Sequence, residues 1–141
     1  MNKNGPIVII EDDEDDRELL ESVLQELNFP NKVLFFKDGE LALQYLKDVT
    51  AFPFIIISDI NLPKLNGFEL RKMVQTNEGI SEKCIPYLFF STAVQRKTVV
   101  DAYMMSAQGI FQKPASYSEI KNTVRVIIEY WQQCCAPNDY E

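Results

Sequence analysis

Two stretches of the sequence place carboxylates directly after apolar runs. Glu11 and Asp12 follow Ile7–Ile10, and Asp59 follows Phe54–Ile57 after a single serine. If the two runs are neighbouring strands, the three carboxylates meet at one edge of a sheet. Carboxylates only a few ångströms apart repel each other and destabilise a fold unless a cation joins them. Oxygen ligands without histidine or cysteine favour Mg²⁺ over a transition metal, so the pattern predicts a magnesium site.

Two further apolar runs end in groups that suit the same site. Tyr87–Phe90 is followed by Ser91 and Thr92, and Gly109–Phe111 is followed one residue later by Lys113. Taken alone, the hydroxyl is better explained as a helix cap and the lysine as a solvated charge. Together with the carboxylates they suit phosphoryl transfer. In that chemistry one carboxylate is the nucleophile, and the metal, ammonium and hydroxyl stabilise charge on the phosphoryl oxygens.

The three acids that come next have a simpler explanation. Glu14, Asp15 and Asp16 stand where the first helix is expected to begin. Acidic side chains in a first helical turn complement the positive end of the helix dipole. We therefore assign these three residues to the helix and leave them out of the site. A helix dipole does not explain Glu11 and Asp12, which stand at the end of a strand.

The elements that must position these groups alternate regularly. The four runs above and Val33–Phe36 are expected to be strands, and apolar residues at helical spacing lie between and after them. The apolar stripes are Leu19, Leu20, Val23, Leu24 and Leu27; Leu41, Ala42, Tyr45 and Leu46; Phe68, Leu70, Met73 and Val74; Val99, Val100, Tyr103 and Met104; and Ile120, Val124, Ile127, Ile128 and Trp131. Such alternation predicts an α/β fold with a parallel sheet covered on both faces. Ligands bind such sheets at the carboxyl ends of the strands, where the polar groups stand.

Length and composition fit one globular domain. The chain has 141 residues, of which 46% are hydrophobic and 25% charged, which is enough to bury a core. We expect a single domain over residues 1–141, with a core over about 6–133 and a short tail at 136–141 that frays. Pro63 and Gly67 bound the loop after Asp59, and we expect the glycine to supply conformational freedom there.

Charge and residue types exclude several classes of function. With 21 acidic and 14 basic residues the net charge is −7, which repels nucleic acids. No run of 18 apolar residues predicts a membrane span, and the first residues lack the apolar core of a signal peptide. The three cysteines have no metal-binding spacing, so we expect reduced thiols and a cytoplasmic location. The absence of histidine excludes a histidine base, nucleophile or metal ligand.

The chain resembles the receiver domain of two-component response regulators over nearly its whole length. The matching features are the pair Glu11-Asp12, the stretch SDINLPKLNGFEL around Asp59, FFSTA with Thr92, and QKPAS with Lys113. Each is weak alone, but four in the right order and spacing are specific. The resemblance implies a flavodoxin-like (βα)5 fold, a three-layer sandwich whose five-stranded parallel sheet has the order 2-1-3-4-5.

The resemblance also implies a phosphoacceptor and a metal site. Asp59 would accept a phosphoryl group from a phosphohistidine on a sensor histidine kinase or a phosphotransfer protein. Asp12 and Asp59 would bind Mg²⁺ through their side chains, Asn61 through its backbone carbonyl and Glu11 through water.

Further implications of the resemblance concern the switch. Thr92 and Lys113 would hold the phosphoryl oxygens, and a cis peptide bond before Pro114 would aim the lysine into the site. Most receivers carry Tyr or Phe at the position of Ile110, an aromatic residue that swings inward on activation. Isoleucine is shorter and stiff at χ1. We therefore expect Ile110 to stay in place and the loops after Asp59 and Thr92 to carry the change.

The last helix is informative about partners. Its end, VIIEYWQQCCAP, resembles stand-alone receivers that serve phytochrome-type and related sensor kinases. In the resembled family, partners meet the face made by the fourth helix, fifth strand and fifth helix. Val126 and Tyr130 lie off the core stripe of the last helix. They predict an apolar interface on this face for a downstream protein or a second copy of the chain.

Three functions remain open from the sequence. The leading hypothesis is a single-domain response regulator that signals by protein contact or phosphorelay, with no enzymatic activity beyond its own phosphorylation and dephosphorylation. The second is a Mg²⁺-dependent phosphohydrolase with Asp59 as nucleophile. Such enzymes usually have a general acid two residues later, where this chain has Asn61. The third is a phosphorylation-independent interaction module, which would have no reason to keep a repulsive acid cluster.

Overall fold

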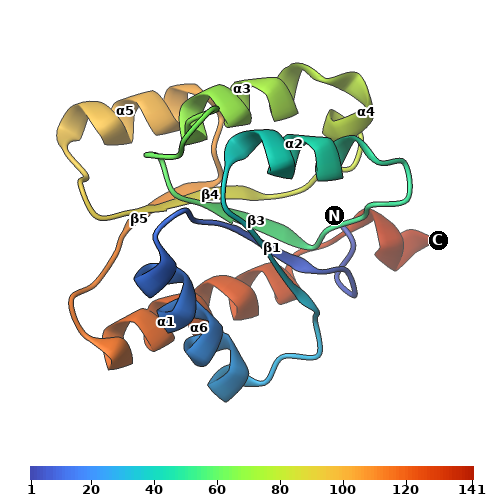
Figure 1. Ribbon diagram of the computed structural model, residues 1–141. Coiled ribbons are helices and arrows are strands. Elements are labelled where there is room, and N and C mark those ends of the chain that lie inside the picture. Colours follow the sequence, from blue (N-terminus) through green and yellow to red (C-terminus); the bar gives the residue numbers. More distant parts are fainter.

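Five parallel strands form one sheet in the computed structural model, which describes all residues from 1 to 141 (Figure 1). The strands are β1 (Ile7–Ile10), β2 (Val33–Phe36), β3 (Ile55–Ser58), β4 (Tyr87–Ser91) and β5 (Gly109–Gln112). Their order is β2-β1-β3-β4-β5. The predicted fold class and strand order are therefore confirmed.

Helices cover both faces of the sheet. One face carries α1 (Glu14–Leu27) and α6 (Tyr117–Gln133). The other carries α2 (Gly39–Lys47), α3 (Gly67–Thr76), α4 (Glu78–Ser81) and α5 (Arg96–Met104), as Figure 1 shows. The four-residue helix α4 has no counterpart in the predicted stripes, so the fourth and fifth predicted helices are α5 and α6. No helix of the chain is both long enough and apolar enough to cross a membrane.

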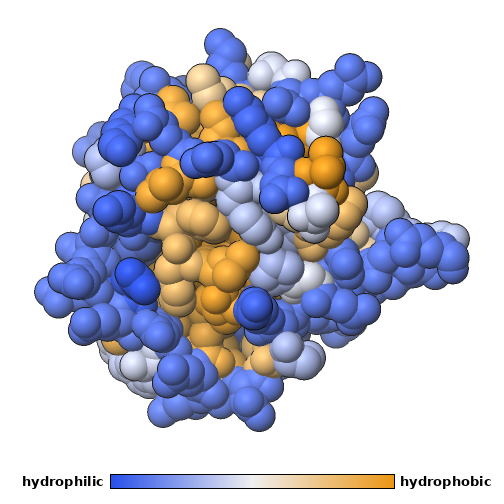
Figure 2. Space-filling model, turned by 45° about the vertical axis from the view of Figure 1, so that its right-hand side comes forward, coloured by the Kyte–Doolittle hydropathy of each residue, from blue (hydrophilic) through white to orange (hydrophobic).

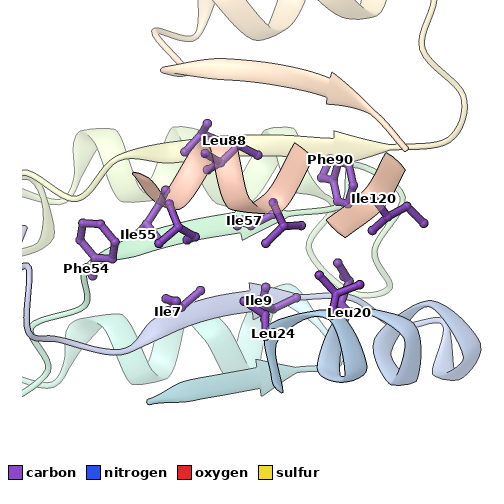
Figure 3. Close-up of a cluster of buried hydrophobic side chains, with 14 of the residues drawn as sticks. Ile7, Ile9, Leu20, Leu24, Phe54, Ile55, Ile57, Leu88, Phe90 and Ile120 are labelled. Carbon is purple, nitrogen blue, oxygen red and sulfur yellow. The ribbon is translucent and has the colours of Figure 1, made fainter. Parts of the chain in front are cut away.

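The central strands are buried on both faces, as the apolar runs predict. Every residue of β1 and β3 is at most 2% exposed. Side chains alternate along a strand. One set therefore packs against α1 and α6 and includes Ile7, Ile9, Ile55 and Ile57 (Figure 3). The alternate residues pack beneath the helices of the opposite face. Core contacts on both sides hold the backbone at the carboxyl ends of these strands, where the polar groups begin.

Helix α5 packs differently from its predicted stripe. Its one buried side chain is Ala102, whereas Val100, Tyr103 and Met104 are 42%, 55% and 80% exposed. The stripe predicted for this helix was therefore wrong for these three residues. Alanine is small enough to let the helix lie close to the sheet, so the larger apolar side chains next to it remain outside the contact.

The C-terminal tail packs against the rest of the protein, so the expectation of a frayed tail was wrong. Residues Pro137–Tyr140 form the 3₁₀ helix η1, and Ala136 just before it is only 2% exposed. Asp139 Oδ2 lies 3.0 Å from Lys3 Nζ and accepts a hydrogen bond from the backbone N–H of Ala136. The tail therefore packs against the N-terminal segment.

A buried arginine joins helices α3 and α5, which cover the same face of the sheet. Arg71 of α3 is 7% exposed, and its Nε and Nη2 donate to the carbonyl oxygens of Met105 (3.1 Å) and Ser106 (2.8 Å). These carbonyls follow α5, where a cation also complements the helix dipole. The guanidinium lies 5.5 Å from the ring centroid of Tyr87, a cation–π distance. Arg71 therefore holds the end of α5 against α3.

Replacing Arg71 by Met should lower the free energy of unfolding by about 2 kcal/mol, because two carbonyls lose charged donors. Urea denaturation of the variant and wild type measures the difference. Lys72→Met, at an exposed position of the same helix, is the control and should change stability by less than about 0.5 kcal/mol. Equal stability of the Arg71 and Lys72 variants would contradict the structural role.

Strand β2 forms one open edge of the sheet. All four of its residues are half-buried, and the exposed residues Lys32 and Lys37 stand directly before and after them. Figure 2 shows one face of the molecule on which a band of apolar side chains reaches the surface between hydrophilic rims. Charged side chains at the ends of an apolar edge strand limit its pairing with other chains.

Candidate functional site

The three candidate metal ligands meet at the carboxyl ends of β1 and β3. These strands are neighbours, and Ile10 is in register with Ser58. Glu11 and Asp12 therefore begin beside Asp59, and one carboxylate oxygen from each residue lies within 4.8 Å of the others. Glu11 is buried, Asp12 is exposed, and Asp59 is half-buried. The structure thus brings together the three acids that the sequence singles out.

The backbone around Asp59 is held by a network of short contacts. The N–H of Ile60 donates to Asp59 Oδ1 at 2.6 Å, and the N–H of Asn61 approaches the same oxygen at 3.4 Å. The hydroxyl of Ser58 donates to the Asp59 carbonyl at 2.7 Å. These contacts engage Oδ1 and leave Oδ2 directed at Lys113.

The loop after Asp59 is shaped differently from the prediction. Gly67 does not adopt a left-handed conformation, and Lys64 takes that role with a φ of 66°. The glycine is required by space instead. A Cβ atom at position 67 would lie 2.3 Å from the carbonyl oxygen of Asp59 and 2.8 Å from Cα of Ile60. The start of α3 is therefore packed directly against the backbone of the candidate phosphoacceptor.

Lys113 reaches the site from the end of β5. Its backbone N–H donates to the carbonyl of Ser91 at 2.8 Å. Its ammonium donates to Glu11 Oε1, to Asp16 Oδ2 at 2.9 Å and to Asp59 Oδ2 at 3.2 Å. The protein contains no cis peptide bond, so the predicted cis bond before Pro114 was wrong. The lysine enters the site from a trans backbone.

Asp16 is the functional contact that sequence reasoning missed. We assigned it to the helix dipole, yet its carboxylate binds the site lysine. Asp13 is the N-cap of α1 and accepts from the backbone N–H of Asp16. A side chain in the first turn leans toward the N-terminal end of its helix. In this fold, that direction points the Asp16 side chain to the carboxyl ends of the strands. The sequence alone could predict this contact only if the position of the helix relative to the strands were already known.

The electrostatics of the cluster are set by burial and by one shared cation. Burial raises the pKa of Glu11 to about 8, and the nearby charge of Asp59 acts in the same direction. Glu11 is 2% exposed, and its Oε2 has no hydrogen-bond partner. Burial also acts to raise the pKa of Asp59, but hydrogen bonding with Glu11 and the charge of Lys113 hold it below its ordinary value. Burial disfavours the charged form of Lys113, yet its carboxylate partners raise its pKa above the ordinary value.

Without metal, the protein should lose stability as the pH rises from about 5 to 8. In this window unfolded Glu11, with an ordinary pKa of 4.5, has released a proton that the folded state retains. The free energy of unfolding then falls with pH, by at most about 1.4 kcal/mol per pH unit for one proton. Urea denaturation in EDTA at several pH values measures the slope. Glu11→Gln should flatten it and Glu18→Gln, at an exposed site, should not; an unchanged slope in Glu11→Gln would refute the assignment.

The side chains of Ser91 and Thr92, at the end of β4, lie in different environments. Thr92 is exposed and lines a cavity of about 170 Å³ together with Asp16 and Lys113. Ser91 is fully buried, and its hydroxyl has no hydrogen-bond partner. Thr92 therefore stands on the same side of the sheet edge as the lysine. Ile110 lies half-buried on β5, packed against the core beneath α2, α3 and α5.

The donor set fits a hard divalent cation. It consists of three carboxylates, and one of them carries a buried oxygen without a partner. Such a set suits Mg²⁺, which prefers oxygen ligands and keeps several waters. The exposed position of Asp12 leaves room for those waters. The same edge carries an ammonium and a hydroxyl, so the arrangement can hold both a cation and the oxygens of a phosphoryl group.

Comparison with known proteins agrees with the fold. The probable methanogenesis regulatory protein FilR2 of Methanothrix harundinacea is 27% identical over 129 residues, covering 89% of this chain and 82% of the relative. The chemotaxis protein CheY-3 of Vibrio cholerae is 29% identical over 129 residues, covering 92% and 95%. The crystal structure of the phosphorylated cyanobacterial phytochrome response regulator RcpA superposes with a TM-score of 0.83 at 25% identity, covering 94% and 97%.

A family model also matches most of the chain. Residues 7–125 match the response regulator receiver domain. This range contains all five strands and every residue of the candidate site. The chain therefore belongs to the family of response regulator receiver domains.

Proposed function

We propose that this chain is a response regulator receiver that accepts a phosphoryl group on Asp59. The donor is a phosphohistidine of a sensor histidine kinase or of a phosphotransfer protein. The observation that carries the proposal is the placement of Asp59 Oδ2, 3.2 Å from the Lys113 ammonium and beside two further carboxylates, in a receiver fold. RcpA, similar over most of this chain, was crystallised in its phosphorylated form.

The reaction is a transfer between two side chains. A carboxylate oxygen of Asp59 attacks the phosphorus, and the bond from phosphorus to the donor imidazole nitrogen breaks. The donor ring carries a proton on its other nitrogen, so it leaves with the electron pair as a neutral imidazole. Lys113 stays charged and donates to the phosphoryl oxygens, and Thr92 donates its hydroxyl to them. The two groups approach from the ends of β5 and β4, on one side of Asp59.

Magnesium fits the acidic side of the site. Asp12 and Asp59 would hold the ion through side chains, Asn61 through its carbonyl and Glu11 through water. When bound, Mg²⁺ neutralises charge on the transferred oxygens and on the clustered carboxylates. Glu11 must release its proton to interact fully with a cation, so its raised pKa makes metal affinity increase with pH.

The output surface is the face formed by α5, β5 and α6. Val126 and Tyr130 are 48% and 61% exposed, as their place off the core stripe predicts. They line a mostly apolar cavity of about 300 Å³ together with Leu88, Phe111 and Trp131. Val100, Tyr103 and Met104 of α5 are also exposed. We propose that this face binds a downstream protein or a second copy of the chain.

The first kinase to test is of the phytochrome type, because RcpA is a phytochrome response regulator. Its rate of phosphotransfer to this chain would be compared with that of an unrelated histidine kinase. A phosphotransfer at least as fast from the unrelated kinase would direct the search for the partner elsewhere.

Incubation with acetyl phosphate and Mg²⁺ tests the proposed chemistry. We expect a mass increase of one phosphoryl group, stable in acid and labile in base, which peptide mapping places on Asp59. EDTA or Asp12→Ala should prevent it. Hydrolysis of a phosphomonoester such as p-nitrophenyl phosphate would favour a phosphohydrolase. The absence of any adduct, with the fold intact, would favour an interaction module and refute the proposal.

A further inference from the structure

The ammonium of Lys113 is saturated before any phosphoryl group arrives. An ammonium has three N–H donors, and here they meet the carboxylates of Glu11, Asp16 and Asp59. The lysine side chain is only 8% exposed, so water has little access to it. A phosphoryl group on Asp59 that needs this ammonium must therefore displace one of the existing partners.

The three partners differ in how easily they are released. Glu11 is 2% exposed, and one of its oxygens already lacks a partner, so bulk water has little access to replace the lysine there. Asp59 carries the phosphoryl group itself. The side chain of Asp16 is 36% exposed, and water can replace the lysine there. Asp16 is therefore the partner that gives way.

The charge of Asp16 acts in the same direction as its hydrogen bond. Asp16 shares a lysine with Asp59 and lines the small cavity that Thr92 also lines. A phosphoryl group on Asp59 brings additional negative charge to the shared lysine, and the neighbouring Asp16 carboxylate repels that charge. Asp16 lies outside the acid cluster formed by Glu11, Asp12 and Asp59. A cation bound to that cluster therefore does not occupy the Asp16 carboxylate.

We propose that Asp16 is a positioning residue that limits phosphorylation of Asp59 by holding Lys113 toward α1. This inference rests on the proposed function of Asp59. Asp16 sets the affinity of the site for a phosphoryl group, since the group must take the lysine from it. The first turn of α1 thereby regulates how much of the protein is phosphorylated at a given supply of donor.

The test compares Asp16→Asn with Asp15→Asn. Both changes remove one negative charge from the first turn of α1, and Asp15 is exposed and makes no side-chain contact with Lys113. Asp16→Asn should bind trifluoroberyllate, an analogue of the phosphoryl group, about five-fold more tightly in the presence of Mg²⁺. Its initial rate of labelling by acetyl phosphate should rise by a similar factor. Asp15→Asn should behave like wild type, and Asp16→Glu should restore values close to wild type.

The outcomes separate this inference from the proposed function. If wild type takes up no phosphoryl group, the proposed function fails. If wild type is phosphorylated but Asp16→Asn and Asp15→Asn behave alike, only the role of Asp16 fails. A residue that merely stabilises the site would make Asp16→Asn weaker than wild type in both measurements, and that result would also overturn the inference.

Discussion

Asp59→Asn is expected to accept no phosphoryl group from acetyl phosphate or from a kinase, while the protein stays folded. The amide nitrogen is not nucleophilic, and a neutral amide oxygen is a poor nucleophile at phosphorus. The amide oxygen can still accept the N–H of Ile60, the contact that holds Oδ1 at 2.6 Å. Intact-mass measurement after incubation with donor and Mg²⁺ shows the loss directly, and circular dichroism checks the fold.

The control for Asp59→Asn is Asp15→Asn, which removes an exposed acid from the first turn of α1, outside the candidate site. It should retain phosphorylation at the wild-type stoichiometry of one group per chain. Stoichiometric labelling of Asp59→Asn would show that another side chain is the acceptor. Exposed Asp12, at the same edge, would be the first to examine by peptide mapping.

Gly67→Ala is expected to combine a loss of stability with a loss of phosphorylation. The added methyl group would meet the carbonyl oxygen of Asp59 at 2.3 Å and Cα of Ile60 at 2.8 Å, both of them backbone atoms. Neither can move aside without shifting the segment that carries the acceptor carboxylate. Overpacking of this kind costs about 2–3 kcal/mol. Urea denaturation measures the stability, and the rate of labelling by acetyl phosphate should fall with it.

Gly79→Ala provides a matched control for that substitution. Gly79 is also in a helix, and a Cβ atom there would meet only Asn77 Oδ1, at 3.5 Å. Alanine favours helix over glycine by up to about 1 kcal/mol, so this variant should be as stable as wild type or slightly more so. If Gly67→Ala were equally well tolerated, the loop after Asp59 would be more adaptable than its contacts indicate.

Most of the fold was predictable because apolar runs and helical stripes report burial directly. The runs Ile7–Ile10 and Phe54–Ile57 predicted strands buried on both faces, and β1 (Ile7–Ile10) and β3 (Ile55–Ser58) match them to within one residue. The convergence of Glu11, Asp12 and Asp59 followed once these strands were taken as neighbours. Helix α5 was less predictable, because Ala102 alone makes its buried contact. An apolar stripe indicates which residues of a helix can be buried. The area of contact between the helix and the sheet determines which of these residues are buried.

The parts that escaped prediction depend on contacts between distant segments. Arg71 and Asp16 look like ordinary surface charges in the sequence. The carbonyls that Arg71 satisfies are 34 and 35 residues away, and the lysine that Asp16 binds is 97 residues away. Gly67 was correctly tied to the loop after Asp59 but for the wrong reason. Close approach between backbones leaves no mark in local sequence beyond the glycine itself.

The two lysines at the ends of β2 have a consequence for self-association. Suppose a second copy paired its β2 with this one in antiparallel fashion, matching Val33 with Phe36 of the other chain. Lys32 would then lie opposite Lys37 at both ends of the new ladder. Like charges directly opposite each other destabilise such pairing. The lysines therefore act as gatekeepers, which keep an open and apolar strand edge from seeding aggregates.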